Sequence, residues 1–132
     1  MTIRLGLIGY GAIGKHVEAA LMSGGIDNLE LVAALVKRPR HEGLLTHEPD
    51  RFFSHKFDLL LAPSAKGEAP SGLGNTGDPI FNRFWTLLGT PCIALPFNTG
   101  PFGLPLSVQL IGPRGRDDQL IAWARWVEQK LA

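Results

Sequence analysis

Short apolar runs alternate with turn-forming segments along this chain, and the lengths of the runs predict strands. The runs cover residues 3–8, 29–36, 58–62, 91–97 and 106–111. Runs of this length, bounded by glycine, proline and small polar residues, are typical of buried strands. Three other segments carry apolar residues at helical spacing, at 14–23, 79–88 and 120–131. This mixture of elements predicts an α/β fold.

The connections between the strands predict how they are arranged. Long connections after the first two strands suit parallel pairing with right-handed crossovers, whereas the short turn at 98–103 makes the last two strands antiparallel. A chain of 132 residues suits one compact domain. We therefore expect a single three-layer, doubly wound sheet of about five strands over residues 1–132. Its expected strand order is 2-1-3-4-5, with strand 5 antiparallel and helices on both faces.

Two of the helical segments carry apolar stripes that predict core packing. Asp78 is expected to cap a helix that begins at Pro79 and ends at Gly89. Its predicted core stripe is Ile80, Phe81, Phe84, Trp85 and Leu88. Asp117 or Asp118 is expected to cap the last helix. The stripe of that helix is Leu120, Ala124, Val127 and Leu131, flanked by Trp123 and Trp126.

The first strand leads into a glycine-rich turn and then into the first helical segment. Gly9, Gly11 and Gly14 have the spacing Gly-x-Gly-x-x-Gly, and Tyr10, Ala12 and Ile13 fill the intervening positions. Between a strand and a helix, this spacing is typical of dinucleotide binding, because glycine lets backbone approach a pyrophosphate beside the helix N-terminus. The sequence therefore predicts that 1–61 is a Rossmann-like half in which these six residues contact the cofactor. A glycine-rich turn that binds nothing is the alternative.

The residues after the second strand bear on which dinucleotide is bound. NAD-binding proteins place an acidic residue here, about twenty residues beyond the glycines, to hold the ribose 2′-hydroxyl. This chain has Lys37 and Arg38 instead, and their positive charges would suit the 2′-phosphate of NADP. The expected cofactor is therefore NADP or NAD, with a solvated basic turn as the alternative.

Composition narrows the classes of partner. A net charge of +1 gives no electrostatic reason to expect a nucleic acid or an anionic membrane as a partner. No apolar stretch approaches membrane length and no signal-peptide pattern is present, so a cytoplasmic protein is expected. Cys92, the single cysteine, is expected to be a small buried residue, and the histidine spacing matches no metal motif. Trp123 and Trp126 make self-association an expected property.

A first set of motifs lies within residues 1–61. They are Gly-Leu-Ile-Gly-Tyr-Gly-Ala-Ile-Gly-Lys at 6–15, Leu-Val-Ala-Ala-Leu-Val at 31–36 and Phe-Asp-Leu-Leu-Leu at 57–61. On these motifs, the segment resembles the N-terminal part of L-aspartate dehydrogenase and its homoserine-dehydrogenase-like relatives. The resemblance implies an NAD(P)-dependent oxidoreductase ancestry. In that family a separate substrate domain carrying a catalytic histidine would follow, and this sequence does not continue in that way.

A second set of motifs lies within residues 57–132. They are Pro-Ser-Ala-Lys-Gly-Glu-Ala-Pro at 63–70, Gly-Asn-Thr-Gly-Asp-Pro-Ile-Phe-Asn-Arg-Phe-Trp-Thr-Leu-Leu-Gly-Thr-Pro-Cys at 74–92 and Gly-Leu-Pro-Leu-Ser-Val-Gln-Leu-Ile-Gly at 103–112. On these motifs, the half at 62–132 resembles the C-terminal end of the amidase signature family. That family hydrolyses amides with two serines and a lysine, which lie upstream of the matching part. The resemblance therefore implies no catalytic residue in this chain.

Two pairs of polar residues in the loop after the third strand are candidates for catalytic pairs. Ser64 and Lys66 can share one side of an extended segment, but a serine–lysine dyad also needs a lysine with a lowered pKa and aligned oxyanion donors. A loop serine beside a solvated lysine is the favoured interpretation. Glu68 and Asp78 are not expected to form an acid–base pair, because Asp78 already has a capping role.

Three hypotheses about function follow. The first is an NAD(P)-binding fragment fused to an amidase C-terminal fragment, without a complete catalytic site. The second is an amidase-family remnant that keeps part of a substrate pocket but lacks the Ser-Ser-Lys triad. The third is a folded fusion or engineered chimera without a selected activity.

Overall fold

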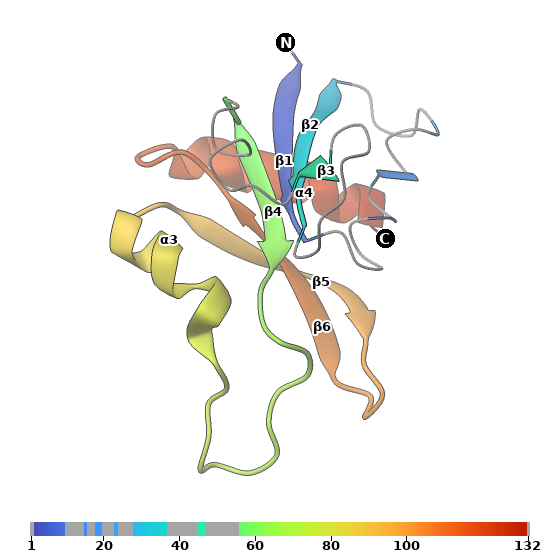
Figure 1. Ribbon diagram of the computed structural model, residues 1–132, viewed down its shortest axis with the longest axis vertical. Helices are drawn as coiled ribbons and strands as arrows, with labels where there is room; N and C mark the ends of the chain where they lie inside the picture. Colours follow the sequence, from blue (N-terminus) through green and yellow to red (C-terminus); the bar gives the residue numbers. More distant parts are fainter. Residues whose placement is uncertain are drawn as a thin grey trace. The chain divides into compact units, whose positions relative to one another are not determined.

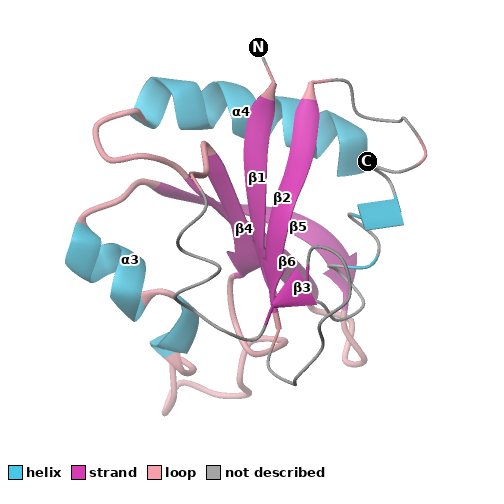
Figure 2. Ribbon diagram, turned by 45° about the horizontal axis from the view of Figure 1, so that its top comes forward, coloured by secondary structure: helices cyan, strands magenta, loops and turns pink. Residues whose placement is uncertain are grey.

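The computed structural model describes residues 2–9, 15, 18–19, 23, 28–36, 45–46 and 56–131. The chain divides into two compact units, Met1–Leu61 and Ala62–Ala132. Figure 1 shows the elements in chain order, and Figure 2 distinguishes helices from strands. The fold class is α/β, as the sequence predicts. The three-layer, Rossmann-like arrangement and the grouping into one domain stay predictions.

The first unit contains a parallel sheet. Its strands are β1 (Ile3–Ile8), β2 (Leu29–Leu35), β3 (Leu45–Thr46) and β4 (Leu59–Pro63), and β4 ends just inside the second unit. β2 and β4 both pair with β1 in parallel, and β3 pairs with β2 in parallel. The order β2-β1-β4 confirms the predicted order 2-1-3. β3 was not predicted, because a two-residue strand is too short to show an alternating pattern.

Apolar side chains on the central strands form the core of the first unit. Leu5, Leu7, Ala34 and Leu59 are almost completely buried. Parallel strands that are covered on both faces read as continuous apolar runs, which explains why the sequence located them well.

Part of the predicted helix at 14–23 falls on described residues. Lys15, Glu18 and Ala19 have helical backbone, and the N–H of Ser23 donates to the carbonyl of Ala19 at 3.0 Å. The other residues of this predicted helix lie outside the described part of the chain.

The second unit is built on an antiparallel hairpin. β5 (Cys92–Thr99) and β6 (Pro105–Ile111) pair antiparallel, which confirms the predicted direction of the last strand. The long helix α4 (Asp117–Leu131) packs on both strands. The 3-10 helix η1 (Pro79–Phe81) and the short helix α3 (Arg83–Leu88) lie between β4 and β5 in the chain. Buried side chains from the hairpin and α4 form the core: Leu95, Val108, Leu110, Leu120 and Ala124.

The predicted position of the last two strands was wrong. Within the second unit, β6 and not β5 lies next to the end of β4, and the N–H of Ser64 donates to the carbonyl of Ser107 at 3.3 Å. β5 is therefore an edge strand, with most of its residues exposed. Pro96 explains this choice, because a proline has no N–H and is tolerated on an edge strand but not in the middle of a sheet.

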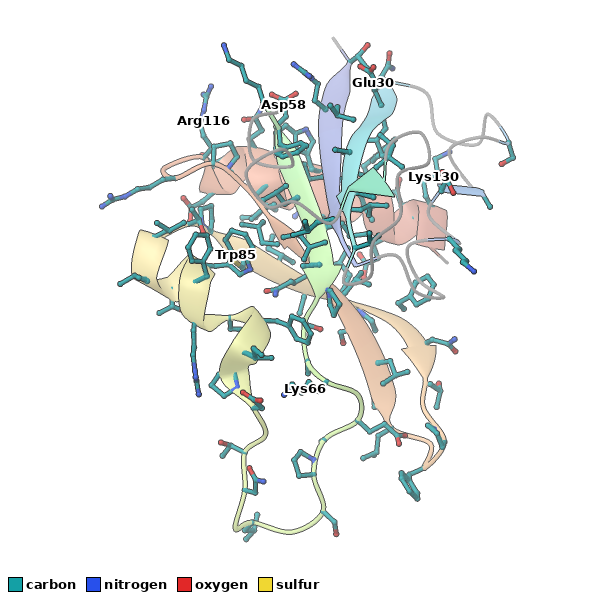
Figure 3. The ribbon with its side chains drawn as sticks, viewed as in Figure 1. Glu30, Asp58, Lys66, Trp85, Arg116 and Lys130 are labelled. Atoms are coloured by element: carbon teal, nitrogen blue, oxygen red, sulfur yellow. The ribbon has the colours of Figure 1, made fainter. Side chains whose placement is uncertain are left out.

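The predicted core stripe at 79–88 was wrong for most of its residues. Trp85 is buried, with 8% of its surface exposed, and Figure 3 labels it on α3. Among the other residues of the predicted stripe, Phe81 is half-buried, whereas Ile80, Phe84 and Leu88 are exposed. Leu87, which was not in the stripe, is 82% exposed. Helical spacing identifies an apolar face but not whether anything covers it.

Two smaller predictions in the second unit need correction. Cys92 is exposed rather than buried, because it opens the edge strand β5. Asp117 and Asp118 lie in the first turn of α4 rather than at its cap. The N–H of Leu120 donates to the carbonyl of Arg116, which makes Arg116 the capping residue. Negative charge in the first turn still interacts favourably with the helix dipole.

Candidate functional site

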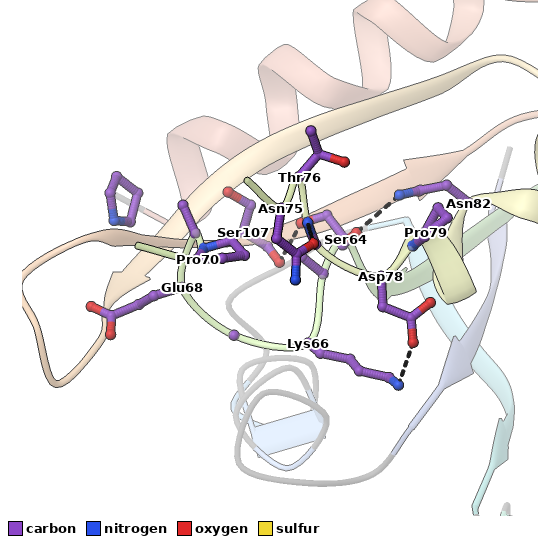
Figure 4. A pocket seen from close by; sticks show the side chains of 15 residues that line it. Ser64, Lys66, Glu68, Pro70, Asn75, Thr76, Asp78, Pro79, Asn82 and Ser107 are labelled. Atoms are coloured by element: carbon purple, nitrogen blue, oxygen red, sulfur yellow. Dashed lines mark hydrogen bonds and ion pairs between the residues drawn. The ribbon is translucent and has the colours of Figure 1, made fainter. Parts of the chain in front are cut away.

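A pocket of about 600 Å³ lies in the second unit, between the loop after β4 and strand β6. We call residues 64–78 the pocket loop. The pocket loop supplies most of the lining, and Pro79, Asn82, Pro105 and Ser107 complete it. Figure 4 shows the side chains that line the pocket. Its volume falls in the range of small-molecule sites.

Strand alternation places the polar residues of β6 beside this pocket. Pro105, Ser107 and Gln109 share one face of β6, because alternate residues of a strand point the same way. Pro105 and Ser107 line the pocket, and Gln109 is the next residue on the same face of β6. The sequence located the strand but not this role of its polar face.

Gln109 is a buried polar side chain that joins three segments around the pocket. Its Nε2 donates to the carbonyl of Pro63 at 3.0 Å and to the carbonyl of Phe81 at 2.9 Å. Pro63 ends β4 and Phe81 ends η1, so one amide holds both segments against β6. Only the amide NH₂ can donate to two carbonyls, so the chemistry fixes the orientation of the side chain.

Ser64 acts as a structural hydrogen-bond donor. Its Oγ donates to the carbonyl of Ser107 at 2.7 Å, and its own carbonyl accepts from Asn82 Nδ2 at 3.2 Å. A serine nucleophile needs a base that accepts its proton, and a backbone carbonyl cannot act as that base.

Lys66 forms an ion pair across the two ends of the pocket loop. Its Nζ lies 2.5 Å from Asp78 Oδ2. Asp78 Oδ1 also accepts from the N–H of Ile80 at 3.1 Å, which confirms the predicted cap of the segment beginning at Pro79. The hydrogen bond from Lys66 lowers the pKa of the Asp78 carboxyl below its usual 3.8, with smaller contributions from Ile80 and Arg83. Ser64 and Lys66 thus have different partners and do not form a dyad.

Glu68 reaches in the other direction, toward the turn between β5 and β6 (Figure 4). Its carboxylate accepts from the N–H of Phe102 at 3.0 and 3.1 Å and from the N–H of Leu104 at 2.8 Å. Glu68 and Asp78 therefore bind different groups, which agrees with the prediction that they do not form an acid–base pair. Reasoning from the sequence missed the contacts of Glu68, because they join residues more than thirty positions apart.

The structure describes one of the predicted cofactor-binding residues. Gly9 follows β1 with a φ of 94°, a conformation that favours glycine, and its N–H donates to the carbonyl of Leu35 at 2.8 Å. The remaining predicted residues lie outside the described part of the chain: Tyr10, Gly11, Ala12, Ile13, Gly14, Lys37 and Arg38. The cofactor site stays a prediction.

Other predicted features can be placed within the described residues. In this part of the chain, no three His, Cys, Asp or Glu side chains are grouped to hold a metal ion. No helix among these residues is both long enough and apolar enough to cross a membrane. Trp123 and Trp126 are half-buried, whereas Leu73 and Phe102 are much more exposed. Self-association stays a prediction.

Comparison with known proteins finds relatives that share part of this chain. No model of a protein family matches it. One subunit of the mitochondrial glutamyl-tRNA(Gln) amidotransferase of Drosophila pseudoobscura pseudoobscura is 33% identical over 86 residues, covering 58% of this chain and 17% of that protein. The same mitochondrial subunit of Homo sapiens is 28% identical over 105 residues, covering 73% and 20%. The glutamyl-tRNA(Gln) amidotransferase subunit of Methylocella silvestris is 30% identical over 127 residues, covering 88% and 26%.

A solved structure also resembles part of the fold. The structure of 6-aminohexanoate cyclic dimer hydrolase complexed with substrate matches with a TM-score of 0.50 and 23% identity. The match covers 62% of this chain and 21% of the hydrolase chain, and it bears on the fold alone.

All three amidotransferase subunits are much longer than this chain. This chain spans from about a sixth to about a quarter of the length of the three amidotransferase subunits. The second unit supplies little more than half of this chain, so all three alignments also include residues of the first unit. The relatives named here are not dehydrogenases, and the resemblance of 1–61 to aspartate dehydrogenase stays a prediction.

Over part of its length, the chain is homologous to the amidase family.

Proposed function

We propose that the second unit supplies a binding wall for a small amide ligand and does not cleave the amide itself. The observation that carries this proposal is the pocket at 64–82, which lies in the segments whose motifs resemble amidases. The name of one group of relatives supports the same chemistry, because those proteins are subunits of an amidotransferase.

The free polar groups of the pocket suit an amide. An amide offers one kind of donor and one kind of acceptor, so its site needs both. Among the described residues, the hydroxyls of Thr76 and Ser107 have no hydrogen-bond partner, and each can donate and accept. The side-chain amide of Asn75 accepts from the N–H of Gly77 and keeps its NH₂ group for a ligand.

The same geometry argues against cleavage by Ser64 and Lys66. Ser64 donates to a backbone carbonyl, and Lys66 is paired with the carboxylate of Asp78. Amide hydrolysis requires an activated nucleophile, and neither residue is arranged as one.

Titration with matched ligands tests the proposal. We expect glutamine to shift the NMR signals of Asn75, Thr76 and Ser107, and glutamate, in which an acid replaces the side-chain amide, to shift them less. The variant Thr76→Val removes a lining hydroxyl and should weaken binding by about tenfold, as expected for a lost polar contact that leaves a partner unpaired. Thr86→Val makes the same change on α3, outside this pocket, and should leave binding unchanged.

An assay of ammonia release tests the absence of cleavage. We expect no release from glutamine above the rate in buffer. Turnover that disappears in Ser64→Ala would show that Ser64 is a nucleophile and would overturn this part of the proposal. Equal shifts with glutamine and glutamate would overturn amide recognition.

We also propose, as a second candidate, that the first unit binds NADP or NAD. The supporting observation is the left-handed Gly9 directly after β1, beside a parallel β2. A dinucleotide at a hundred times its Kd should stabilise the fold by about 2.7 kcal/mol, so melting with NADPH and with NADH tests this candidate. If neither dinucleotides nor amides bind, the hypothesis of a folded chimera without a selected activity remains.

A further inference from the structure

We propose that Glu68 is a latch that holds the pocket loop closed on the β5–β6 turn and so controls access to the pocket. The part that concerns ligand exchange rests on the proposed amide binding. The closing of the loop does not depend on that function.

The latch is a single side chain in the first half of the loop, two residues after Lys66. Glu68 accepts hydrogen bonds from two backbone N–H groups of the β5–β6 turn, those of Phe102 and Leu104. The other side-chain contacts of the pocket loop lie near its two ends: Ser64 with Ser107, Lys66 with Asp78, and Asn75 with Gly77. Within the described residues, Glu68 is thus the side chain that joins the pocket loop to the β5–β6 turn.

The turn is shaped to receive this carboxylate. The N–H of Gly103 donates to the carbonyl of Gly100 at 3.0 Å, and the N–H of Gly100 donates to the carbonyl of Leu104 at 2.9 Å. This tight turn leaves the N–H groups of Phe102 and Leu104 for Glu68. A Cβ atom on Gly100 would overlap the Glu68 side chain, so the carboxylate occupies the space that glycine leaves open.

Burial indicates that the loop depends on this contact. Residues 69–76 are all exposed, whereas Glu68 is half-buried. A segment with few buried contacts opens at low free energy, and its opening is limited by the interactions that remain. Because the pocket loop forms most of the pocket lining, its release from the turn would remove one wall of the pocket.

Two variants break the latch from opposite sides. Glu68→Ala removes the carboxylate, and Gly100→Ala displaces it with a methyl group at a position whose backbone accepts alanine. Glu128→Ala on α4 removes an equal charge at an exposed position away from the loop and serves as the control. Glu68→Gln keeps one acceptor oxygen, so this variant should keep part of the contact with the turn and show a smaller change than Glu68→Ala. Circular dichroism establishes that each variant is folded.

Opening of the loop can be measured without a ligand. Trypsin cleaves after Lys66, inside the pocket loop, and we expect cleavage there to be about tenfold faster in Glu68→Ala and in Gly100→Ala. Hydrogen exchange at the N–H groups of Phe102 and Leu104 should rise by a similar factor. The double variant should match the single variants, because both changes remove the same contact. Unchanged cleavage and exchange in the folded single variants would overturn the latch.

Ligand exchange tests the consequence for the pocket. With glutamine as the probe, both variants should raise the association and dissociation rates together and change Kd less. If glutamine associates and dissociates at the same rates in the variants as in the original chain, Glu68 does not control access to the pocket, even if trypsin cleaves the variants faster. If the original chain binds no glutamine, amide binding fails, and trypsin cleavage alone then decides whether the latch closes the loop.

Discussion

Replacement of Gln109 by methionine should destabilise the second unit by removing two buried hydrogen bonds. Gln109 is 3% exposed and donates to the carbonyls of Pro63 and Phe81 at 3.0 and 2.9 Å. Methionine is similar in length and shape but has no N–H to donate. The change therefore separates hydrogen bonding from packing.

The expected size of the effect follows from these two bonds. A net hydrogen bond contributes about 0.5–1.5 kcal/mol, and a buried carbonyl left without a donor costs about 1–3 kcal/mol. Pro63 and Phe81 are half-buried, so water can reach part of their surface and the lower values apply. We expect the free energy of unfolding to fall by about 2–3 kcal/mol. In Gln109→Glu the loss should be larger at neutral pH, because a carboxylate would face two carbonyl oxygens.

Urea unfolding followed by tryptophan fluorescence measures this change. All three tryptophans lie in the second unit, as does Gln109. Ser107→Ala is the matched control on the same face of β6, because Ser64 donates to the backbone carbonyl of Ser107 and that bond survives. The control should change stability by less than about 0.5 kcal/mol. A Gln109→Met variant as stable as the control would show that the two hydrogen bonds do not hold the pocket walls.

Three further predictions concern other parts of the second unit. Trp85→Ala should cost about 3–5 kcal/mol of unfolding free energy and Leu87→Ala less than about 0.5 kcal/mol, since only Trp85 is buried; similar urea midpoints for the two would contradict this difference in burial. The pKa of Asp78 is lower in the folded chain than its usual value of 3.8, so the ionised carboxylate stabilises the fold when the pH is above 3.8. This stabilisation is lost as the pH falls through the pKa of the folded chain. Lys66→Met should therefore lower the melting temperature at about pH 6 and have little effect at about pH 2, and an equal effect at both would refute the ion pair. Cys92 is exposed, so a maleimide should label it in the folded chain; because desolvation raises its thiol pKa, the rate should increase about tenfold per pH unit near neutrality, and protection from labelling would contradict its place on β5.

The sequence predicts the strands and their directions well, because their apolar runs reflect burial on a sheet. β1 has the predicted bounds, and β5 and β6 differ from prediction by two residues or fewer. The position of β6 beside β4 was missed, although Pro96 carries the signal that β5 is an edge strand.

Side-chain roles were harder to predict than the strands. The cap at Asp78 depends on adjacent residues and was predicted correctly. The contacts of Glu68 and Gln109 depend on the position of β6, which the sequence did not establish. The exposed face of α3 was taken for core, because periodicity measures only the contrast between two faces of a helix.

Pro96 also bears on how this protein behaves at high concentration. An edge strand with an unbroken row of N–H and C=O groups can recruit a strand from another molecule and start aggregation. In β5 the proline interrupts the donors, and the irregular pairing between Pro96 and Asn98 bends the strand. The residue that specifies the edge of the sheet thus also hinders intermolecular growth of β-structure from that edge.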